Sequence, residues 1–89
     1  MELTITIELW RKKGWYVAKS PELDFISQGN TPEEAKKNLK EVINIQFQEM
    51  EEMGTLEDYL SECGFKAEND IIVPMNEIIG FEKSSLRIG

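Results

Sequence analysis

The sequence predicts an α+β fold: a three-stranded antiparallel meander, a long helix that covers it, a short second helix and a fourth strand. Three observations predict this fold. Apolar and polar residues alternate over residues 2–9, turn-forming residues divide residues 11–30 into short segments, and an apolar stripe with helical spacing runs over residues 35–50. A chain of 89 residues is long enough for only one core, so residues 1–89 are expected to form a single domain.

The first two strands are predicted to form a hairpin. Within residues 2–9 every second residue is Leu or Ile, which is typical of a half-buried strand. The polar stretch over residues 11–14 ends in glycine and is typical of a hairpin turn, and residues 15–19 then return as an aromatic-rich strand. These segments therefore predict an antiparallel pair.

A turn and a short third strand follow. Pro21 has no amide hydrogen and disfavours helical backbone at Ser20, so the second strand is expected to end there. Residues 24–29 have the composition of a short strand that ends at Gly29. A meander of three strands has one apolar face, which needs a covering element.

A long helix is predicted to supply that cover. Thr31 is expected to cap its N-terminus, Pro32 fits the first helical position, and Glu34 completes a capping box. Gly54 predicts its C-terminal end. The residues of the stripe expected to face the sheet are Ala35, Leu39, Val42, Ile43, Phe47 and Met50.

The last third of the chain contains weaker signals. Thr55 predicts the cap of a short second helix over residues 56–63, which a glycine ends. Cys63 is predicted to be a small core residue, because the chain has no histidine to activate its thiol. Residues 77–88 are expected to be extended and to return to the meander as its fourth strand, while the path of residues 65–82 stays open.

Charge and residue usage exclude several classes of protein. The formal net charge is −7, from 17 acidic and 10 basic residues, so direct binding to nucleic acid is not expected. With one cysteine and no histidine, the chain has no internal disulfide, no Cys–His nucleophile pair and no ordinary zinc site. Residues 1–10 carry acids and alternate, which is typical of neither a signal peptide nor a membrane span, so we expect a cytoplasmic protein without membrane contact.

Carboxylates are the only catalytic groups that are plentiful. Several of them would hold Mg²⁺ if they converged, as a metal-dependent nuclease requires. Glu8 belongs to the polar side of its strand, whereas the helix packs on the other side, so convergence is not expected. We therefore expect no catalytic residue, cofactor or metal, and we keep the nuclease as an alternative. The acids considered are Glu8, Asp24, Glu34, Glu41 and Glu49.

Tryptophans near the hairpin turn are candidates for contact with a partner protein. Trp and Tyr are enriched at binding hot spots, although packing within the hairpin is the simpler explanation. An exposed sheet edge and acidic groups on the side of the helix complete the expected contact surface. The residues predicted to form this possible partner surface are Trp10, Trp15, Glu33 and Glu41.

The segment GWYVAKSPELDFISQGNTPEEAKKNLKEVI, residues 14–43, resembles the HicB antitoxin family. The shared pattern is an aromatic-Val-Ala strand, a Pro-Glu-Leu turn, a short strand ending in Gly, and Thr-x-Glu-Glu-Ala at the start of a helix. It covers roughly the first half of the chain. The matching residues are Tyr16, Val17, Ala18, Pro21, Glu22, Leu23, Gly29, Thr31, Glu33, Glu34 and Ala35, followed by Leu39 and Val42 on the helix.

The resemblance implies a partial RNase H-like fold that lacks the nuclease carboxylates. It also implies a protein that neutralises a HicA-type mRNA interferase, a small basic toxin, by covering the toxin's active site. The segment after Gly54 is acidic and offers no basic recognition helix, so the chain resembles a short form without a DNA-binding module. We therefore expect a non-enzymatic antitoxin-type protein that forms homo-oligomers. The alternatives are the nuclease and an orphan oligomeric binding domain.

Overall fold

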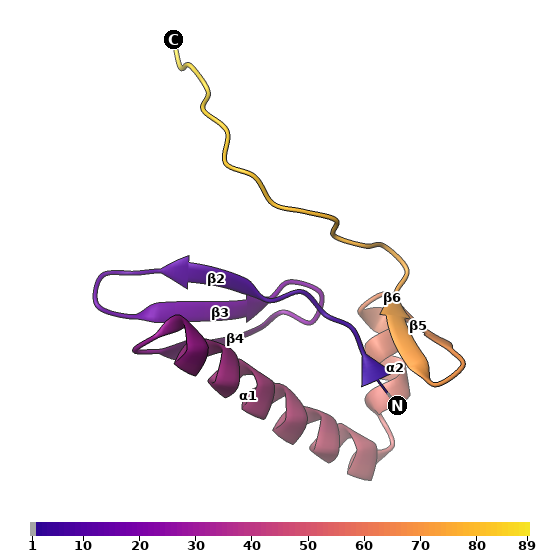
Figure 1. The fold of residues 1–89 in the computed structure, drawn as a ribbon. Helices are drawn as coiled ribbons and strands as arrows, with labels where there is room; N and C mark the ends of the chain where they lie inside the picture. The colour runs from indigo at the N-terminus through magenta and orange to yellow at the C-terminus, as the bar shows by residue number, and fades with distance from the viewer. Residues whose placement is uncertain (1) are drawn as a thin grey trace.

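The chain folds into six strands and two helices, and it has the α+β character that the sequence predicts (Figure 1). The structure, a computed structural model, describes residues 2–89. The strands pair into two three-stranded sheets, in the orders β2-β3-β4 and β1-β6-β5. The elements are β1 (Glu2–Leu3), β2 (Glu8–Arg11), β3 (Tyr16–Ser20), β4 (Phe25–Gly29), α1 (Pro32–Met53), α2 (Leu56–Glu62), β5 (Phe65–Glu68) and β6 (Ile71–Pro74).

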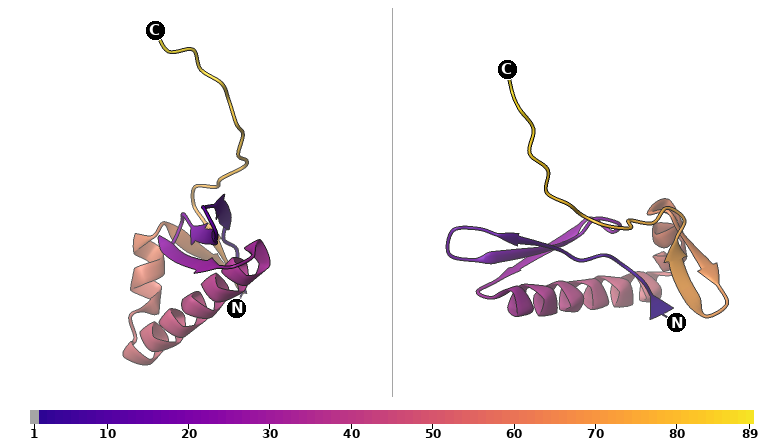
Figure 2. Two further views of the ribbon diagram at one scale, coloured as in Figure 1. Left: turned by 90° about the vertical axis from the view of Figure 1, so that its left-hand side faces the viewer. Right: turned by 45° about the horizontal axis from the view of Figure 1, so that its top comes forward.

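The predicted antiparallel meander is confirmed as the sheet β2-β3-β4. The hairpin closes where the Lys12 amide donates to the Trp15 carbonyl at 2.9 Å, and Gly14 in the turn has φ of +86°. Helix α1 lies along β3 and β4 and covers one face of this sheet (Figure 2). Ala18, Ala35 and Leu39 are fully buried between the helix and the sheet, so the core sits there.

The predicted single strand over residues 2–9 is wrong in its middle. Residues 4–7 belong to neither sheet, while β1 before them pairs in parallel with β6 and β2 after them pairs with β3. The carboxylate of Glu22 accepts hydrogen bonds from the Thr6 amide at 3.0 Å and the Thr6 hydroxyl at 2.8 Å. This carboxylate takes the place of a strand partner, so the chain can cross from one sheet to the other.

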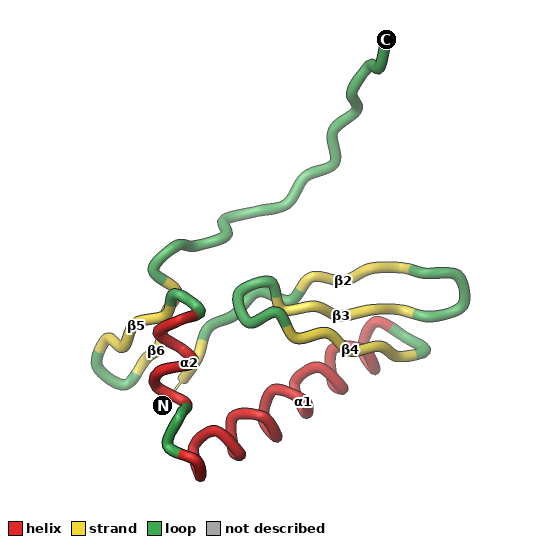
Figure 3. Tube along the Cα trace, turned by 180° about the vertical axis from the view of Figure 1, so that it is seen from behind, coloured by secondary structure: helices red, strands yellow, loops and turns green. Residues whose placement is uncertain are grey.

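The predicted fourth strand of the meander is also corrected. Residues 77–88 form no strand, and the chain beyond β6 extends away from the rest of the molecule (Figure 3). The apolar run at residues 71–74 forms strand β6, which belongs to the second sheet and not to the meander. It forms a hairpin with β5 and pairs with β1, where Leu3 lies opposite Ile72. The second sheet is therefore built from both ends of the folded chain.

The long helix confirms the predicted boundaries. Glu34 donates its amide to the Thr31 hydroxyl at 3.0 Å, and Gly54 ends the helix with φ of +73°. The carboxylate of Glu34 accepts from the Asn30 amide at 3.1 Å, one residue earlier than a capping box requires. Thr55 is the N-cap residue of α2, as predicted, but its side chain makes no capping hydrogen bond, and its hydroxyl donates to the Met50 carbonyl at 3.4 Å instead.

Candidate functional site

The turn that carries the resemblance is a structural joint. The Ser20 side chain is fully buried, and its hydroxyl accepts a hydrogen bond from the Leu23 amide at 3.3 Å. Asp24 donates its amide to the Ser20 carbonyl at 2.7 Å and adopts φ of +59°, a conformation that Asp tolerates better than most residues. Glu22 is engaged by Thr6, and Leu23 is buried in the core. The predicted motif residues of this turn therefore fix the backbone.

The second half of the motif joins β4 to α1. A Cβ atom added at Gly29 would lie 2.6 Å from the Ala35 nitrogen and 2.9 Å from the Glu34 carbonyl carbon. Only glycine allows this approach, because both neighbouring atoms belong to the helix backbone. Ala35 is fully buried at the same contact, and Thr31 caps the helix. The small residues of the motif therefore set the distance between sheet and helix.

The predicted tryptophans lie on the hairpin and are about half exposed, at 51% for Trp10 and 44% for Trp15. The indole of Trp10 donates to a Glu8 carboxylate oxygen at 2.6 Å, and the Lys12 ammonium lies 5.5 Å from its ring centroid. Trp10 lies opposite Val17 across the strands, on the sheet face that α1 does not cover. The packing within the hairpin thus leaves about half of the Trp10 side chain exposed.

The two acidic residues of the predicted partner surface, Glu33 and Glu41, lie on α1, away from the tryptophans of the hairpin. Glu33 and Glu41 are both exposed on α1 and line one shallow hollow of its surface. Lys36, Lys37 and Lys40 line the same hollow, so bases outnumber acids there. The structure therefore brings the two glutamates together but separates them from the hollow that Trp10 lines.

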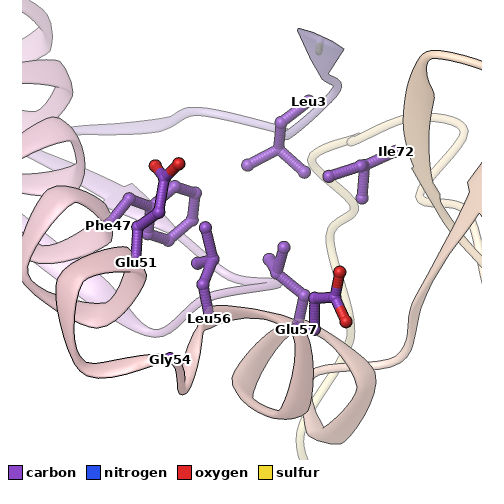
Figure 4. Close-up of a pocket in the computed structure, with 8 residues that line it drawn as sticks. Leu3, Phe47, Glu51, Gly54, Leu56, Glu57 and Ile72 are labelled. Carbon is purple, nitrogen blue, oxygen red and sulfur yellow. The ribbon is translucent and has the colours of Figure 1, made fainter.

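A larger apolar hollow lies between the C-terminal half of α1, α2 and the second sheet (Figure 4). Its volume is about 580 Å³, and the carboxylates of Glu51 and Glu57 stand at opposite sides of it. Sequence reasoning missed this hollow because the β1–β6 pairing that brings its two walls together is distant in sequence. The apolar residues that line it are Leu3, Phe47, Leu56, Leu60 and Ile72.

The surroundings of this hollow are strongly acidic. Residues 42–65 contain no lysine or arginine, and neither helix has a basic residue in its last turn. A basic residue would normally be favoured there by the helix dipole. The acidic rim, as we call it, consists of Glu51 and Glu57, which line the hollow. The same two helices carry further exposed acids at Glu49, Glu52, Asp58 and Glu62.

Tyr59 connects α2 to the turn at residues 20–24. Its hydroxyl donates to the Leu23 carbonyl at 2.9 Å, and its ring packs against Phe25 and Phe47 with centroid distances of 6.2 and 6.4 Å. Burial raises the pKa of Tyr59 to about 12, with further contributions from the Cys63 thiol and the Asp24 carboxylate. The phenol is therefore neutral at physiological pH and serves as a hydrogen-bond donor.

Three of the acids considered for metal binding, Glu8, Asp24 and Glu34, have separate partners. Glu8 binds the Trp10 indole, and Asp24 lies 3.9 Å from the Lys19 ammonium. Glu34 binds the Asn30 amide near the start of α1. Within residues 2–89, no group of three or more His, Cys, Asp or Glu side chains is placed to hold a metal ion.

Comparisons with family models, with curated proteins and with solved structures found no match to this chain. No helix formed by residues 2–89 is both long enough and apolar enough to cross a membrane. The fold and its surfaces define a small α+β protein whose principal hollow combines apolar walls with an acidic rim.

Proposed function

We propose that this protein is a HicB-like, antitoxin-type binding protein of the cytoplasm that neutralises a HicA-type mRNA interferase by covering the toxin's active site. The resemblance of residues 14–43 supports the family, and the meander with its covering helix agrees with the part of a partial RNase H-like fold that this segment carries. The acidic rim beside an apolar hollow carries the proposal, because a small basic toxin is complementary to it.

The proposed mechanism is occlusion guided by charge. The net charge of −7 attracts a basic protein at a distance, and the acidic rim concentrates part of that charge around one hollow. Apolar side chains of the toxin fill the hollow while its lysine and arginine residues pair with Glu51 and Glu57. The bound antitoxin then keeps mRNA from the toxin's active site, and no chemical step is required of this chain.

The test uses a HicA-type protein, which is sought first as a small basic protein encoded in an adjacent reading frame. Calorimetry measures binding of the HicA-type protein to the proposed antitoxin. RNA cleavage by the HicA-type protein is followed with and without the proposed antitoxin. The double substitution Glu51→Lys and Glu57→Lys is expected to weaken binding by about tenfold or more and to restore cleavage, because it reverses both charges at the hollow.

A matched control reverses the charges of Glu33 and Glu41, which line the shallow hollow on α1. Glu33→Lys with Glu41→Lys changes the net charge equally but acts where Lys36, Lys37 and Lys40 already lie, so binding should change by about twofold or less. The opposite result would place the toxin on the surface predicted from Trp10, Trp15, Glu33 and Glu41. Absence of binding to any HicA-type protein would overturn the proposal, and RNA cleavage by the purified chain with Mn²⁺ would favour the nuclease.

A further inference from the structure

Residues 75–89 form an arm that leaves the molecule after β6 (Figures 1 and 2). We call this segment the C-terminal arm. It is not a polar linker, because apolar side chains recur along it. Leu86 and Ile88 are 87% and 97% exposed, so they touch almost nothing of their own molecule. The other exposed apolar residues of the arm are Met75, Ile78, Ile79 and Phe81.

The arm also has the pattern of a strand. Leu86 and Ile88 alternate with Ser85 and Arg87, so in extended backbone the two apolar side chains share one face. Fifteen extended residues span about 50 Å, which is long enough to reach a second molecule. The arm carries two acids, Glu77 and Glu82, and two bases, Lys83 and Arg87, so its formal charge is zero. Unlike the body, it is not repelled by another copy that carries −7.

The edge strand β2 is open and carries one large exposed apolar side chain on each face. Leu9 and Trp10, on opposite faces of this strand, are 46% and 51% exposed. Helix α1 covers β3 and β4 but does not extend over β2 (Figure 2). Among residues 2–89, no backbone group of Glu8 to Arg11 has a hydrogen-bond partner other than within the pairing with β3. An uncovered edge of this kind is a template for another strand.

The other sheet edges are less suitable. The carbonyl of Gln28 in β4 accepts a hydrogen bond from the Asn38 side chain of α1 at 2.8 Å, so the helix already engages this edge. The large apolar side chain of strand β5, Phe65, is already buried in the core, so this edge offers no large apolar side chain for a new contact. Strand β1 has only two residues, which limits what it can pair with.

We propose that the C-terminal arm of one copy adds as a strand to β2 of a second copy, and that the exchange is reciprocal and gives a two-fold dimer. Leu86 and Ile88 then cover Leu9, which α1 leaves uncovered. Arg87 faces the opposite side of the strand, where it meets Glu8 and the ring of Trp10. Both the apolar and the charged side of the arm thus find complements on β2. This dimer does not depend on a toxin.

The first experiment measures the mass of the full chain by sedimentation over a series of concentrations, with no toxin present. A dimer is expected. Leu86→Asp with Ile88→Asp should weaken dimerisation by about tenfold or more, because charges replace the apolar contacts. Asn76→Asp with Ser84→Asp adds the same charge to the same arm at polar positions, and it should change the dimerisation constant by about twofold or less.

A second experiment identifies the acceptor strand. In a Cys63→Ala background, a Leu9→Cys protein is mixed with a Leu86→Cys protein and oxidised mildly, so that any disulfide between them is intermolecular. A cross-link is expected, and replacing the Leu9→Cys protein by a Glu68→Cys protein, which labels β5, should remove it. This control also shows whether the disulfide depends on the docked geometry.

The outcomes separate the alternatives. A monomer at all concentrations, whether the arm is mobile or folded back on its own β2, overturns the proposal. A dimer that survives Leu86→Asp with Ile88→Asp, or a cross-link that favours Glu68→Cys over Leu9→Cys, also overturns it. Because no toxin is present, failure here leaves the proposed toxin binding standing, and failure of toxin binding leaves the dimer standing.

Discussion

Two regions of the molecule contain similar sequence signals but differ in structure. The meander half consists of the sheet β2-β3-β4 and α1, and the C-terminal region consists of residues 55–89. In the meander half, Thr31 caps α1 through its side chain and Gly29 packs against the helix backbone. In the C-terminal region, Thr55 makes no such cap, and Gly80 has no atom within 4 Å of where its Cβ would lie. A threonine or a glycine therefore has different effects in the two regions, depending on which groups its own atoms meet.

The largest effect is expected from the core of the meander half. Leu39 is fully buried, so Leu39→Ala should lower the free energy of unfolding by about 3 kcal/mol through lost contacts and a residual cavity. Leu86→Ala removes the same atoms from the exposed arm and should change that free energy by less than about 0.5 kcal/mol in dilute, monomeric protein. Urea denaturation followed by circular dichroism measures both. Equal losses would contradict the division into a packed and an unpacked region.

The next largest effect concerns the glycines. Gly29→Ala places a Cβ within 3 Å of backbone atoms of α1, and the resulting shift of helix from sheet should cost about 2 kcal/mol. Gly80→Ala meets no neighbouring atom and should be neutral or slightly stabilising. Thermal denaturation of the two variants compares the sites directly. A neutral Gly29→Ala would show that the helix can move away at no cost.

The sequence was sufficient for the elements whose signals are local. The limits of α1 follow from Thr31 and Gly54, and its buried face follows from the apolar stripe. The break at residues 4–7 was not predictable, because it depends on the Glu22 carboxylate and on pairing between β1 and β6. Nothing in an alternating segment indicates that a distant side chain will replace a strand partner.

The hollow was less predictable than the fold. Phe47, Leu56 and Leu60 were recognisable as apolar helix residues, and the acidic composition around them was visible. The opposite wall, formed by Leu3 and Ile72, requires the parallel pairing of two strands from the ends of the folded chain. Periodicity identifies which residues are buried, but it does not identify which segments meet.

The two threonines that precede helices give a smaller expected effect. Thr31→Ala removes a hydroxyl that accepts from the Glu34 amide at 3.0 Å, and it should cost about 1 kcal/mol of stability. Thr55→Ala removes a hydroxyl that does not cap α2, and it should cost less than about 0.5 kcal/mol. Chemical denaturation of both variants tests the comparison, which would fail if the two losses were equal.

The last prediction concerns Tyr59, which joins the two regions, and it is confined to alkaline pH. The folded state holds the phenol neutral with a pKa of about 12, against an ordinary value of 10.0. The folded state therefore retains a proton that the unfolded chain loses between these values. The contribution of Tyr59 to the free energy of unfolding should therefore be constant below about pH 10 and fall between pH 10 and 12.

The control is Tyr59→Phe, which keeps the ring between Phe25 and Phe47 but lacks the proton. This variant loses the hydrogen bond to the Leu23 carbonyl and should be less stable by about 1 kcal/mol at neutral pH. Its stability should then fall less steeply than that of the wild type above pH 10. Parallel curves would mean that Tyr59 does not couple α2 to the joint at residues 20–24, and that the C-terminal region is held to the meander by apolar contacts alone.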